Sequence, residues 1–580
     1  MADNSYLRNG TGYYRYNSLE DFLNGATPET VCFTYGYENL MRDDPASRVM
    51  YHKASIYAQD DWDVTDRLKL TAGVRIDDFF FDNSNIIRNN WAYELEYPDA
   101  AGNVRHIDTG KWPKAVPLVS PRVGFNWDVL GDKSLKVRGG TGLFTGRIPL
   151  VFLTNMPSNS SMNQYNGIIT TVYNSDGTIT PDPNLKEFAG RLITDYEEMR
   201  AKWKDLGYPT TISPEDGGKL SKLAAVDPNF KMPQVWKTAL AVDYAIPVNF
   251  PFTVTVEGMF NQNVNASTME DWNMKPVDGF ARFNGADNRP IYPTGNFTYT
   301  GTSAYVLTNT NLGYTWSGNV TVNMTPVEGL HFMAAYTHVV AKEVTSLPGS
   351  DPASIFNYVP TVNGPNYTGL HLAQNCTPDR VVASLTHDDK SNNHFSFIYE
   401  AWRGGYNYSY MLTNDMNGDN YSYDSLFIPT DKQVEDREFR FASDDDRKRF
   451  MEYVHNDSYL SKHQGEYAEG YAVYSPWVHR LDFSYKHDFK VKVGKSTNTL
   501  QLNLNVKNLL NLFNDSWGVS KYMNSDLQSG RILKFDGVDG DGYPVFSTPA
   551  AVSGSTQTWK PNTNVGQCWY ASVGIKYMFN

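Results

Sequence analysis

The sequence predicts an all-β fold in which one antiparallel sheet forms a transmembrane β-barrel. Three observations lead to this prediction. The chain ends in a long strand pattern at 569–580, in which apolar and polar residues alternate. Segments with the same period of two recur along the sequence. Their connections alternate strictly between short turns and long polar loops, an asymmetry that is typical of outer-membrane barrels and that a sandwich or a propeller does not require.

Composition is compatible with a barrel and excludes several other classes of protein. The 580 residues are 41% hydrophobic and 20% charged, and no apolar run reaches the 18 residues of a transmembrane helix. A barrel strand needs apolar residues only at every second position. The aromatic content of 14% suits interface girdles, or a soluble all-β protein that binds carbohydrate. A net charge of −13 without a basic block argues against nucleic acid as a partner.

Cysteine usage and the first residues carry less information. Cys32, Cys376 and Cys568 form no metal-binding spacing, and an odd number excludes a complete disulfide framework. We expect free thiols, with a Cys32–Cys376 disulfide as the alternative because both fall in predicted outer loops. The N-terminal residues lack the charged and apolar regions of a signal peptide.

Taken in order, the chain starts with a polar, aromatic region at 1–48 that we interpret as an extracellular loop region. It contains one short helix pattern at 18–23. A partial barrel then spans 49–580. A weak strand pattern near 31–37 is the alternative that would change the strand count.

The first hairpin has the clearest pattern. Its strands are 51–62 and 67–77, and the second places Arg67, Lys69 and Arg75 opposite a wholly apolar face. A charged face behind an apolar one is normal for a barrel with a wet lumen. The other strand pairs and the last strand follow the same pattern: 122–129 with 135–143, 236–246 with 252–260, 316–324 with 330–336, the hairpin 379–402, 481–485 with 500–506, and 569–580.

These segments give about thirteen strands separated by predicted outer loops at 82–118, 147–232, 265–303, 344–378, 404–476 and 514–566. If the short turns are periplasmic, the first and last strands both run towards the periplasm. An intact bacterial barrel has an even number of strands and begins and ends in the periplasm. We therefore expect the C-terminal part of a larger barrel. Its last strand should pair with 500–506, and its other edge needs a strand that this chain lacks.

The last strand also carries a signal for assembly. Ser572, Gly574, Tyr577 and Phe579 resemble the C-terminal signal of bacterial outer-membrane barrels, although Asn580 follows the final aromatic residue. The resemblance implies the barrel-assembly machinery as a partner and outer-membrane lipid as the surroundings.

Several segments resemble TonB-dependent outer-membrane receptors. Tyr57-Ala58-Gln59-Asp60-Asp61-Trp62 followed by 68–77 is similar to a hairpin of that family, as are 120–125 and 138–144. Segments 227–236, 459–482 and 508–518 are similar to the Oar-like subgroup, in which a carboxypeptidase-regulatory-like domain and a plug precede the barrel. The resemblance extends from about residue 15 to the C-terminus.

This resemblance implies a 22-stranded barrel in the outer membrane of a Gram-negative cell, of which the chain holds about the last thirteen strands. It implies import of a scarce or bulky ligand, driven by the TonB complex through an N-terminal plug that is absent here. Ferric siderophores, oligosaccharides, peptides and cobalamin all remain open as ligands. A passive porin or channel is the alternative function, and a soluble carbohydrate-binding protein is a weaker one.

Two local motifs are candidate binding sites. Asp415, Asn417 and Asp419, with Asp424 nearby, resemble the start of a calcium loop, although Leu426 occupies the position of the usual bidentate glutamate. The alternative is a solvated turn. Asp536, Asp539 and Asp541 form a looser version.

A group of tyrosines could stack on a sugar or another flat ligand at the barrel mouth: Tyr406, Tyr408, Tyr410, Tyr421 and Tyr423. The alternative is an interface girdle with loop packing. The sequence contains no phosphate-binding loop, zinc signature or nucleophile elbow, so we do not expect an enzyme.

Overall fold

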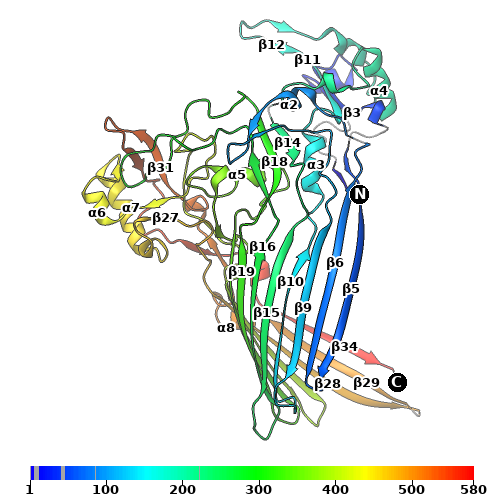
Figure 1. Ribbon diagram of the computed structural model, residues 1–580, viewed down its shortest axis with the longest axis vertical. Helices are drawn as coiled ribbons and strands as arrows, with labels where there is room; N and C mark the ends of the chain where they lie inside the picture. The colour runs from blue at the N-terminus through cyan, green and yellow to red at the C-terminus, as the bar shows by residue number, and fades with distance from the viewer. Residues whose placement is uncertain are drawn as a thin grey trace.

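The computed structural model describes residues 2–4, 12–40, 46–84, 86–220, 222–494 and 496–579. One antiparallel sheet of fourteen strands dominates it (Figure 1). Thirteen of the strands lie side by side in series, and the short β21 (His371–Leu372) pairs with one of them. Within this series, each strand pairs with the strand that precedes it and the strand that follows it along the chain. The wall of an up-and-down barrel has the same arrangement.

The thirteen strands in series are β5 (Tyr51–Thr65), β6 (Leu68–Phe81), β9 (Leu118–Asp128), β10 (Leu135–Thr145), β15 (Gln234–Ala245), β16 (Phe252–Asn263), β19 (Tyr314–Val327), β20 (Leu330–Glu343), β22 (Asp379–Asp388), β23 (Asn393–Arg403), β28 (Val478–Val493), β29 (Ser496–Lys507) and β34 (Tyr570–Met578). The predicted all-β fold and its strand segments are confirmed.

The alternation of residues gives the sheet one apolar and one polar face. On the apolar face, register partners on successive strands form a continuous row of Val242, Val256, Val320, Tyr336 and Val381. This row would be exposed to water in a soluble protein, whereas in a membrane it contacts lipid.

The polar face is held together by charged and amide side chains. Arg138 on β10 makes ion pairs of 3.2 Å with Asp243 and 3.0 Å with Glu257, on the two following strands. Asn319 donates a 2.7 Å hydrogen bond to the Thr337 hydroxyl. These contacts pair polar groups on a face that encloses the lumen when the sheet curves into a barrel.

Connections at the two ends of the sheet differ in length. At one end the turns are short, as at 66–67 and 328–329, and at the other they are long and folded (Figure 1). Gly329 has φ +77°, and a Cβ there would lie 2.2 Å from the Asp388 carbonyl oxygen, so this turn requires glycine. The long connections are 82–117, 146–233, 264–313, 344–378, 404–477 and 508–569.

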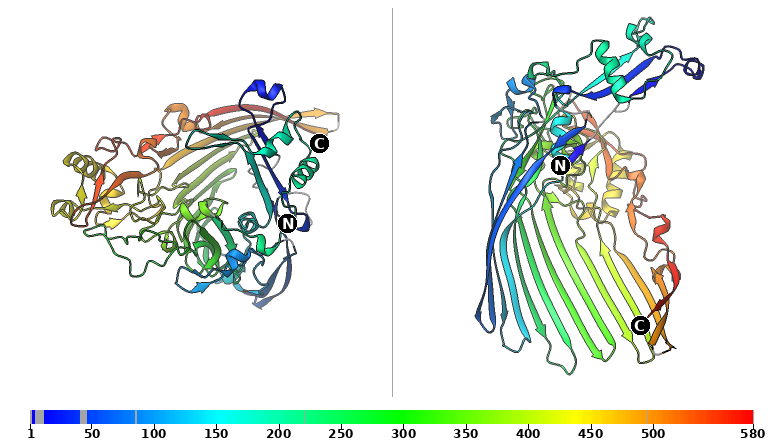
Figure 2. Two further views of the ribbon diagram at one scale, coloured as in Figure 1. Left: turned by 90° about the horizontal axis from the view of Figure 1, so that it is seen from above. Right: turned by 90° about the vertical axis from the view of Figure 1, so that its right-hand side faces the viewer.

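The long connections build a cap with its own secondary structure (Figures 1 and 2). Its helices are α1 (Leu19–Leu23), α2 (Asn90–Glu94), α3 (Val151–Ser158), α4 (Tyr196–Asp205), α5 (Pro352–Asn357), α6 (Asp431–Glu435), α7 (Asp444–Asn456) and α8 (Leu509–Phe513).

Small sheets complete the cap: β1 (Ala2–Asn4) with β4 (Ser47–Val49); β2 (Tyr13–Arg15), β3 (Thr30–Gly36) and β11 (Gln164–Thr170); β7 (Tyr97–Pro98) with β8 (Val104–Arg105); β12 (Val172–Tyr173) with β13 (Ile179–Thr180); β14 (Lys222–Val226), β17 (Ala266–Asp271) and β18 (Ser303–Thr310); β24 (Met411–Leu412), β26 (Arg440–Phe441), β31 (Arg531–Val538) and β32 (Pro544–Ser547); β25 (Phe427–Ile428) with β27 (Glu466–Tyr467); and β30 (Lys521–Met523) with β33 (Trp559–Pro561).

The cap contains most of the buried apolar side chains. The largest cluster includes Tyr410, Phe450, Ile532 and Phe546, all fully buried. The loops are therefore packed folding units with hydrophobic cores, which can hold side chains in fixed positions.

The N-terminal region belongs to this cap. Ser18 caps the predicted helix, now α1, by accepting a hydrogen bond from the Asp21 N–H. The strand pattern near 31–37 does form a strand, β3, but β3 pairs with β2 and β11 and not with the large sheet. The series of thirteen strands is therefore unchanged.

Two further expectations concern the end of the chain and the thiols. β34 pairs with β29, with Leu500 opposite Tyr577 and Val506 opposite Ala571, as predicted. The three cysteines are free in the structure. Among the described residues, no helix is long and apolar enough to cross a membrane.

Candidate functional site: a tyrosine-lined pocket in the cap

Three consecutive long connections, 344–378, 404–477 and 508–569, meet around a pocket of about 450 Å³. Aromatic and amide residues make up half of its lining. The lining includes Tyr358, Gln374, Tyr406, Asn407, Tyr408, Tyr423, Tyr471 and Arg531.

The tyrosine rings are arranged in contacting pairs. Tyr406 and Tyr408 meet edge to face with ring centres 5.3 Å apart, and Tyr358 and Tyr423 are 5.3 Å apart at 39°. Each ring is held in place by its partner. Binding a ligand against it therefore costs little further conformational entropy. Tyr406 remains 55% exposed, so one of its faces is accessible to a ligand.

A buried amide fixes the segment that carries Tyr406 and Tyr408. The Asn407 Nδ2 donates hydrogen bonds of 3.2 Å to the Ala373 carbonyl and 2.9 Å to the Cys376 carbonyl. Gly404, with φ +77°, starts this segment after β23, and a Cβ there would lie 2.7 Å from a Pro378 ring carbon. The connection before β22 and the connection after β23 are therefore joined at the pocket.

One cation lies beside the tyrosines. The Arg531 guanidinium is 4.7 Å from the centre of the Tyr423 ring and donates a 3.1 Å hydrogen bond to the Ser422 carbonyl. Tyr471 also lines the pocket, and its hydroxyl donates a 2.8 Å hydrogen bond to the Tyr358 carbonyl. Stacking faces, amides and one guanidinium together suit a polar ligand that contains a ring or an anionic group.

The five tyrosines singled out in the sequence separate into two groups. Tyr406, Tyr408 and Tyr423 line the pocket. Tyr410 is fully buried, and its hydroxyl donates a 2.8 Å hydrogen bond to Asp457. Tyr421 packs edge to face against Phe356 at 5.4 Å, away from the pocket. Burial raises the pKa of Tyr410 and of Tyr421.

Sequence reasoning did not single out Tyr358, Tyr471 and Arg531. They come from other parts of the chain, and no local pattern connects them to Tyr406. Only the position of all three in predicted long loops could have suggested them, which is a weak signal.

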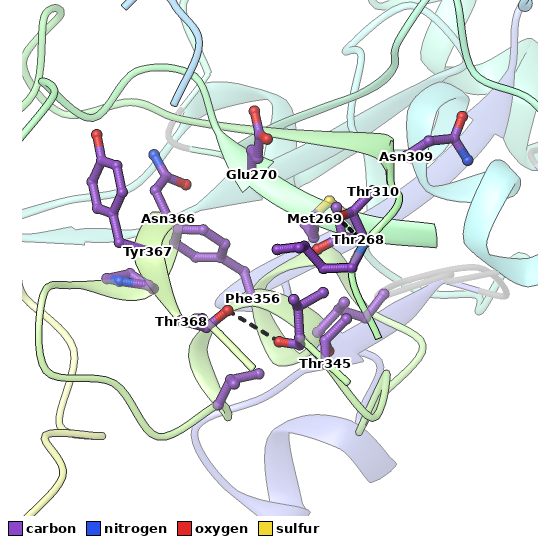
Figure 3. Close-up of a pocket in the computed structure, with 16 residues that line it drawn as sticks. Thr268, Met269, Glu270, Asn309, Thr310, Thr345, Phe356, Asn366, Tyr367 and Thr368 are labelled. Atoms are coloured by element: carbon purple, nitrogen blue, oxygen red, sulfur yellow. Dashed lines mark hydrogen bonds between the residues drawn. The ribbon is translucent and has the colours of Figure 1, made fainter. Parts of the chain in front are cut away.

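A second, smaller pocket of about 250 Å³ lies between β17, β18, α5 and the segment 365–369 (Figure 3). Its lining includes Thr268, Glu270, Phe356 and Tyr367. Burial raises the pKa of Glu270, which accepts a 2.9 Å hydrogen bond from the Trp272 indole. Because its lining offers fewer aromatic faces, we regard the tyrosine-lined pocket as the stronger candidate.

Ser572, Gly574 and Tyr577 of the predicted assembly signal lie on β34, and Phe579 follows the end of this strand. Ser572 faces Asn505 and Gly574 faces Asn503 in the register with β29. The Tyr577 hydroxyl accepts a 2.6 Å hydrogen bond from the Asn498 amide, and the Phe579 ring contacts that of Tyr577 at 4.6 Å. Phe579 is 80% exposed, as expected for a side chain that projects from an edge strand.

The predicted calcium loop is a turn beside the pocket that is buried at some positions and exposed at others. Asn417, Asp419 and Asp424 are each about 1% exposed, and Tyr423 precedes Asp424 in the chain. In the part of the chain that the structure describes, no three His, Cys, Asp or Glu side chains are close enough together to hold a metal ion by themselves.

Comparison with protein families gives one match over most of the chain. The model described as "Outer membrane beta barrel domain" matches residues 2–532. Comparison with curated protein sequences gives no match.

Several solved structures are similar over most of this chain. The siderophore receptor PiuA from Acinetobacter baumannii shares 9% identity, with a TM-score of 0.35, over 95% of this chain and 44% of its own. The outer membrane transporter YddB from Escherichia coli shares 9%, with a TM-score of 0.38, over 91% and 54%. A mutant of the ferric enterobactin receptor PfeA from Pseudomonas aeruginosa shares 8%, with a TM-score of 0.36, over 95% and 58%. The chain spans about half the length of these structures.

Proposed function

Because the chain belongs to the outer membrane β-barrel domain family, we propose that it acts in the uptake of a ligand across the outer membrane, as the C-terminal barrel part of a TonB-dependent receptor. The family is one of outer-membrane barrels, so the sheet lies in the outer membrane with its apolar face in lipid. The finer assignment to TonB-dependent transport, and to the Oar-like subgroup, rests on the sequence motifs described above.

The tyrosine-lined pocket is the observation that carries this proposal. Its lining residues belong to long connections, which lie at the end of the sheet opposite the short turns (Figure 1). That end is the outer side when the short turns face the periplasm. A transporter that captures a scarce ligand needs a binding site there, whereas a passive porin needs only a wide lumen. The pocket combines stacking faces with amides and a guanidinium, so it can bind a specific ligand.

The proposal also names partners. Receptors of the resembled family use a plug domain that the TonB complex pulls, and the barrel-assembly machinery inserts such barrels into the membrane. Outer-membrane lipid contacts the apolar row that includes Val256 and Val320. The proposed ligand belongs to one of four classes: ferric siderophores, oligosaccharides, peptides or cobalamin.

Uptake by cells with and without the gene tests this function. We expect the deletion to abolish uptake of one of the four ligand classes, and we expect an ionophore that collapses the proton-motive force to abolish the same uptake in wild-type cells. Uptake that continues in the presence of the ionophore would indicate a passive channel and contradict the TonB-dependent assignment.

A matched pair of variants tests the pocket. Tyr406→Ala removes an exposed ring from the pocket, and Tyr173→Ala removes an equally exposed ring from the distant strand β12; the two side chains are 55% and 56% exposed. We expect Tyr406→Ala to reduce the affinity of uptake roughly 10-fold, since one stacking contact contributes about 1–3 kcal/mol. Tyr173→Ala should leave uptake unchanged. If both variants reduced the affinity of uptake equally, the tyrosine-lined pocket would be excluded as the ligand-binding site.

A further inference from the structure

A turn of the cap at 415–424 contains several oxygen-bearing side chains that accept hydrogen bonds from its own backbone N–H groups. The Asp415 carboxylate accepts hydrogen bonds of 2.8 Å from the N–H groups of Gly418 and Asn420. The Asn417 amide oxygen accepts a 3.0 Å bond from the Asp419 N–H. Gly418 and Asn420 adopt positive φ angles of 80° and 74°, which allow the chain to coil this tightly.

Asp424 closes the turn from its C-terminal side. One of its oxygens accepts a 2.9 Å bond from the Met416 N–H, and the other accepts a 2.9 Å bond from Arg289. Arg289 also forms two 2.9 Å hydrogen bonds with Asp287. Arg289 is completely buried, and both carboxylates are about 1% exposed.

The charges of this group do not balance. Asp287, Asp419 and Asp424 are buried carboxylates, and Arg289 is the buried cation that contacts two of them, so the group has a formal charge of −2 when ionised. A buried charge without a partner is strongly unfavourable, so such charges in proteins are normally paired or bound to a metal.

Asp419 is the residue that has no cation partner in the contacts of the described residues. Its Oδ2 is buried and makes no hydrogen bond, and the same is true of the nearby Asn417 Nδ2. The side chain therefore has an oxygen available to a positive ligand.

We propose that Asp415, Asn417, Asp419 and Asp424 bind a calcium ion. Ca²⁺ takes six to eight oxygen ligands, and calcium loops supply side-chain oxygens from positions 1, 3 and 5 and a carbonyl from position 7. Those positions correspond here to Asp415, Asn417, Asp419 and the Tyr421 carbonyl. Among the described residues, no three His, Cys, Asp or Glu side chains could hold a metal ion by themselves, so the proposed shell also needs the amide and carbonyl oxygens. A divalent cation would also cancel the charge of −2.

Ion binding at this turn would connect two long loops of the cap. The Tyr292 N–H donates a 2.7 Å hydrogen bond to the Asn417 carbonyl, and the Asn420 amide contacts that of Asn296 at 3.3 Å. The turn also fixes Tyr423, whose ring lines the tyrosine-lined pocket. The inference of a calcium site does not rest on the proposed transport function. Calcium binding can be measured without knowing the transported ligand.

A second aspartate-rich turn in the same chain provides an internal control. There the Asp539 carboxylate accepts hydrogen bonds of 3.0 and 3.1 Å from the N–H groups of Asp541 and Tyr543, much as in the first turn. Arg440 forms ion pairs with both Asp539 and Asp541. Because this cation already compensates the carboxylates, we expect no calcium site in that turn.

The test uses the full chain purified in detergent, stripped with EDTA, and titrated with CaCl₂ in a calorimeter. We expect one site in the wild type and a higher melting temperature with Ca²⁺ than with EDTA. Asp419→Asn should weaken Ca²⁺ binding by roughly 100-fold or more, because it removes a charged ligand. Asp539→Asn should bind Ca²⁺ as the wild type does.

The melting temperature in EDTA separates ion binding from a merely structural role. Without calcium, Asp419→Asn removes a buried negative charge, so this variant should melt at a higher temperature than the wild type. A wild type that binds no Ca²⁺, an Asp419→Asn variant that binds it equally well, or an Asp419→Asn variant that melts at a lower temperature in EDTA would each overturn the proposal.

Discussion

At the scale of single residues, the cap contains charged groups whose burial has consequences for its stability. Asp271 lies at the end of β17 and is completely buried. Its carboxylate accepts hydrogen bonds of 2.9 Å from the N–H groups of Asn273 and Ala304, which holds β17, β18 and the following turn together. Burial raises the pKa of Asp271 to about 6, although these hydrogen bonds act in the opposite direction.

The raised pKa predicts how Asp271 affects stability with pH. A carboxyl group whose pKa is higher in the folded state stabilises the fold below its unfolded pKa, near 4, and that contribution is lost as the pH rises through about 6. Asp271→Asn keeps an acceptor for the two N–H groups and removes the charge. We therefore expect the variant to melt above the wild type at pH 8, by an amount equivalent to roughly 1–3 kcal/mol.

The same comparison at pH 4.5 supplies the control for Asp271. The wild-type carboxyl is then largely protonated in the folded state, so the difference in melting temperature should become small. If Asp271→Asn and the wild type differed in melting temperature by the same amount at pH 4.5 and at pH 8, the charge of Asp271 would not be the cause of that difference.

Individual residues of the tyrosine-lined pocket were predictable only where they lie close together along the chain. Tyr406 and Tyr408 were found because they are close together in the chain. Arg531 and Tyr358 were not, because they reach their positions through the tertiary packing of loops that have no periodic pattern. The burial of Tyr410 has the same origin, since it depends on the cap core around Phe450.

At the scale of elements, strand periodicity carried the fold prediction. Val254, Val256 and Phe260 on β16 alternate with Thr255 and Glu257, and that alternation alone assigns each residue to a face. The short helices and small sheets of the cap lack such repetition, and tertiary packing decides them. β3 shows the difference, because its strand pattern was visible in the sequence but its partner β11 was not.

A pair of substitutions on β16 tests which face contacts lipid. Val256 lies within the apolar row and is 51% exposed, whereas Thr255 on the opposite face donates a 2.7 Å hydrogen bond to Asp243. We expect Val256→Arg to destabilise the barrel by about 2–4 kcal/mol, because it places a charge near the middle of the membrane. Urea unfolding in lipid vesicles and the amount of protein in the outer membrane measure the effect.

Thr255→Arg is the matched control for this experiment. Its guanidinium would lie on the polar face, where the neighbouring carboxylates of Asp243 and Glu257 already pair with Arg138. We expect a change of less than about 1 kcal/mol, as is usual for partly exposed ion pairs. If Thr255→Arg were the more damaging of the two, the assignment of the faces would be reversed.

At the scale of the whole molecule, the sheet has two unpaired edges, β5 and β34, within the part of the chain that the structure describes (Figure 2). In a membrane every backbone N–H and C=O group needs a partner, so both edges must be paired. Twelve antiparallel steps separate β5 from β34, and the two strands therefore run in the same direction. Direct closure would create a parallel seam, whereas any odd number of additional strands between them would allow antiparallel closure.

We propose that additional strands lie between β5 and β34 in the membrane, as the resemblance to a 22-stranded barrel implies. Disulfide trapping in cells tests this, with the three native cysteines replaced by serine. Cysteines at Ile56 on β5 and Ile575 on β34, both on the apolar face, should not form a disulfide, since a disulfide needs Cα atoms within about 7 Å. A pair at Leu502 and Ile575, which are register partners, should be trapped and serves as the positive control. A disulfide between β5 and β34 at this position, or at Ala54 or Ala58 in place of Ile56, would show that the thirteen strands close on themselves, and it would exclude the larger barrel.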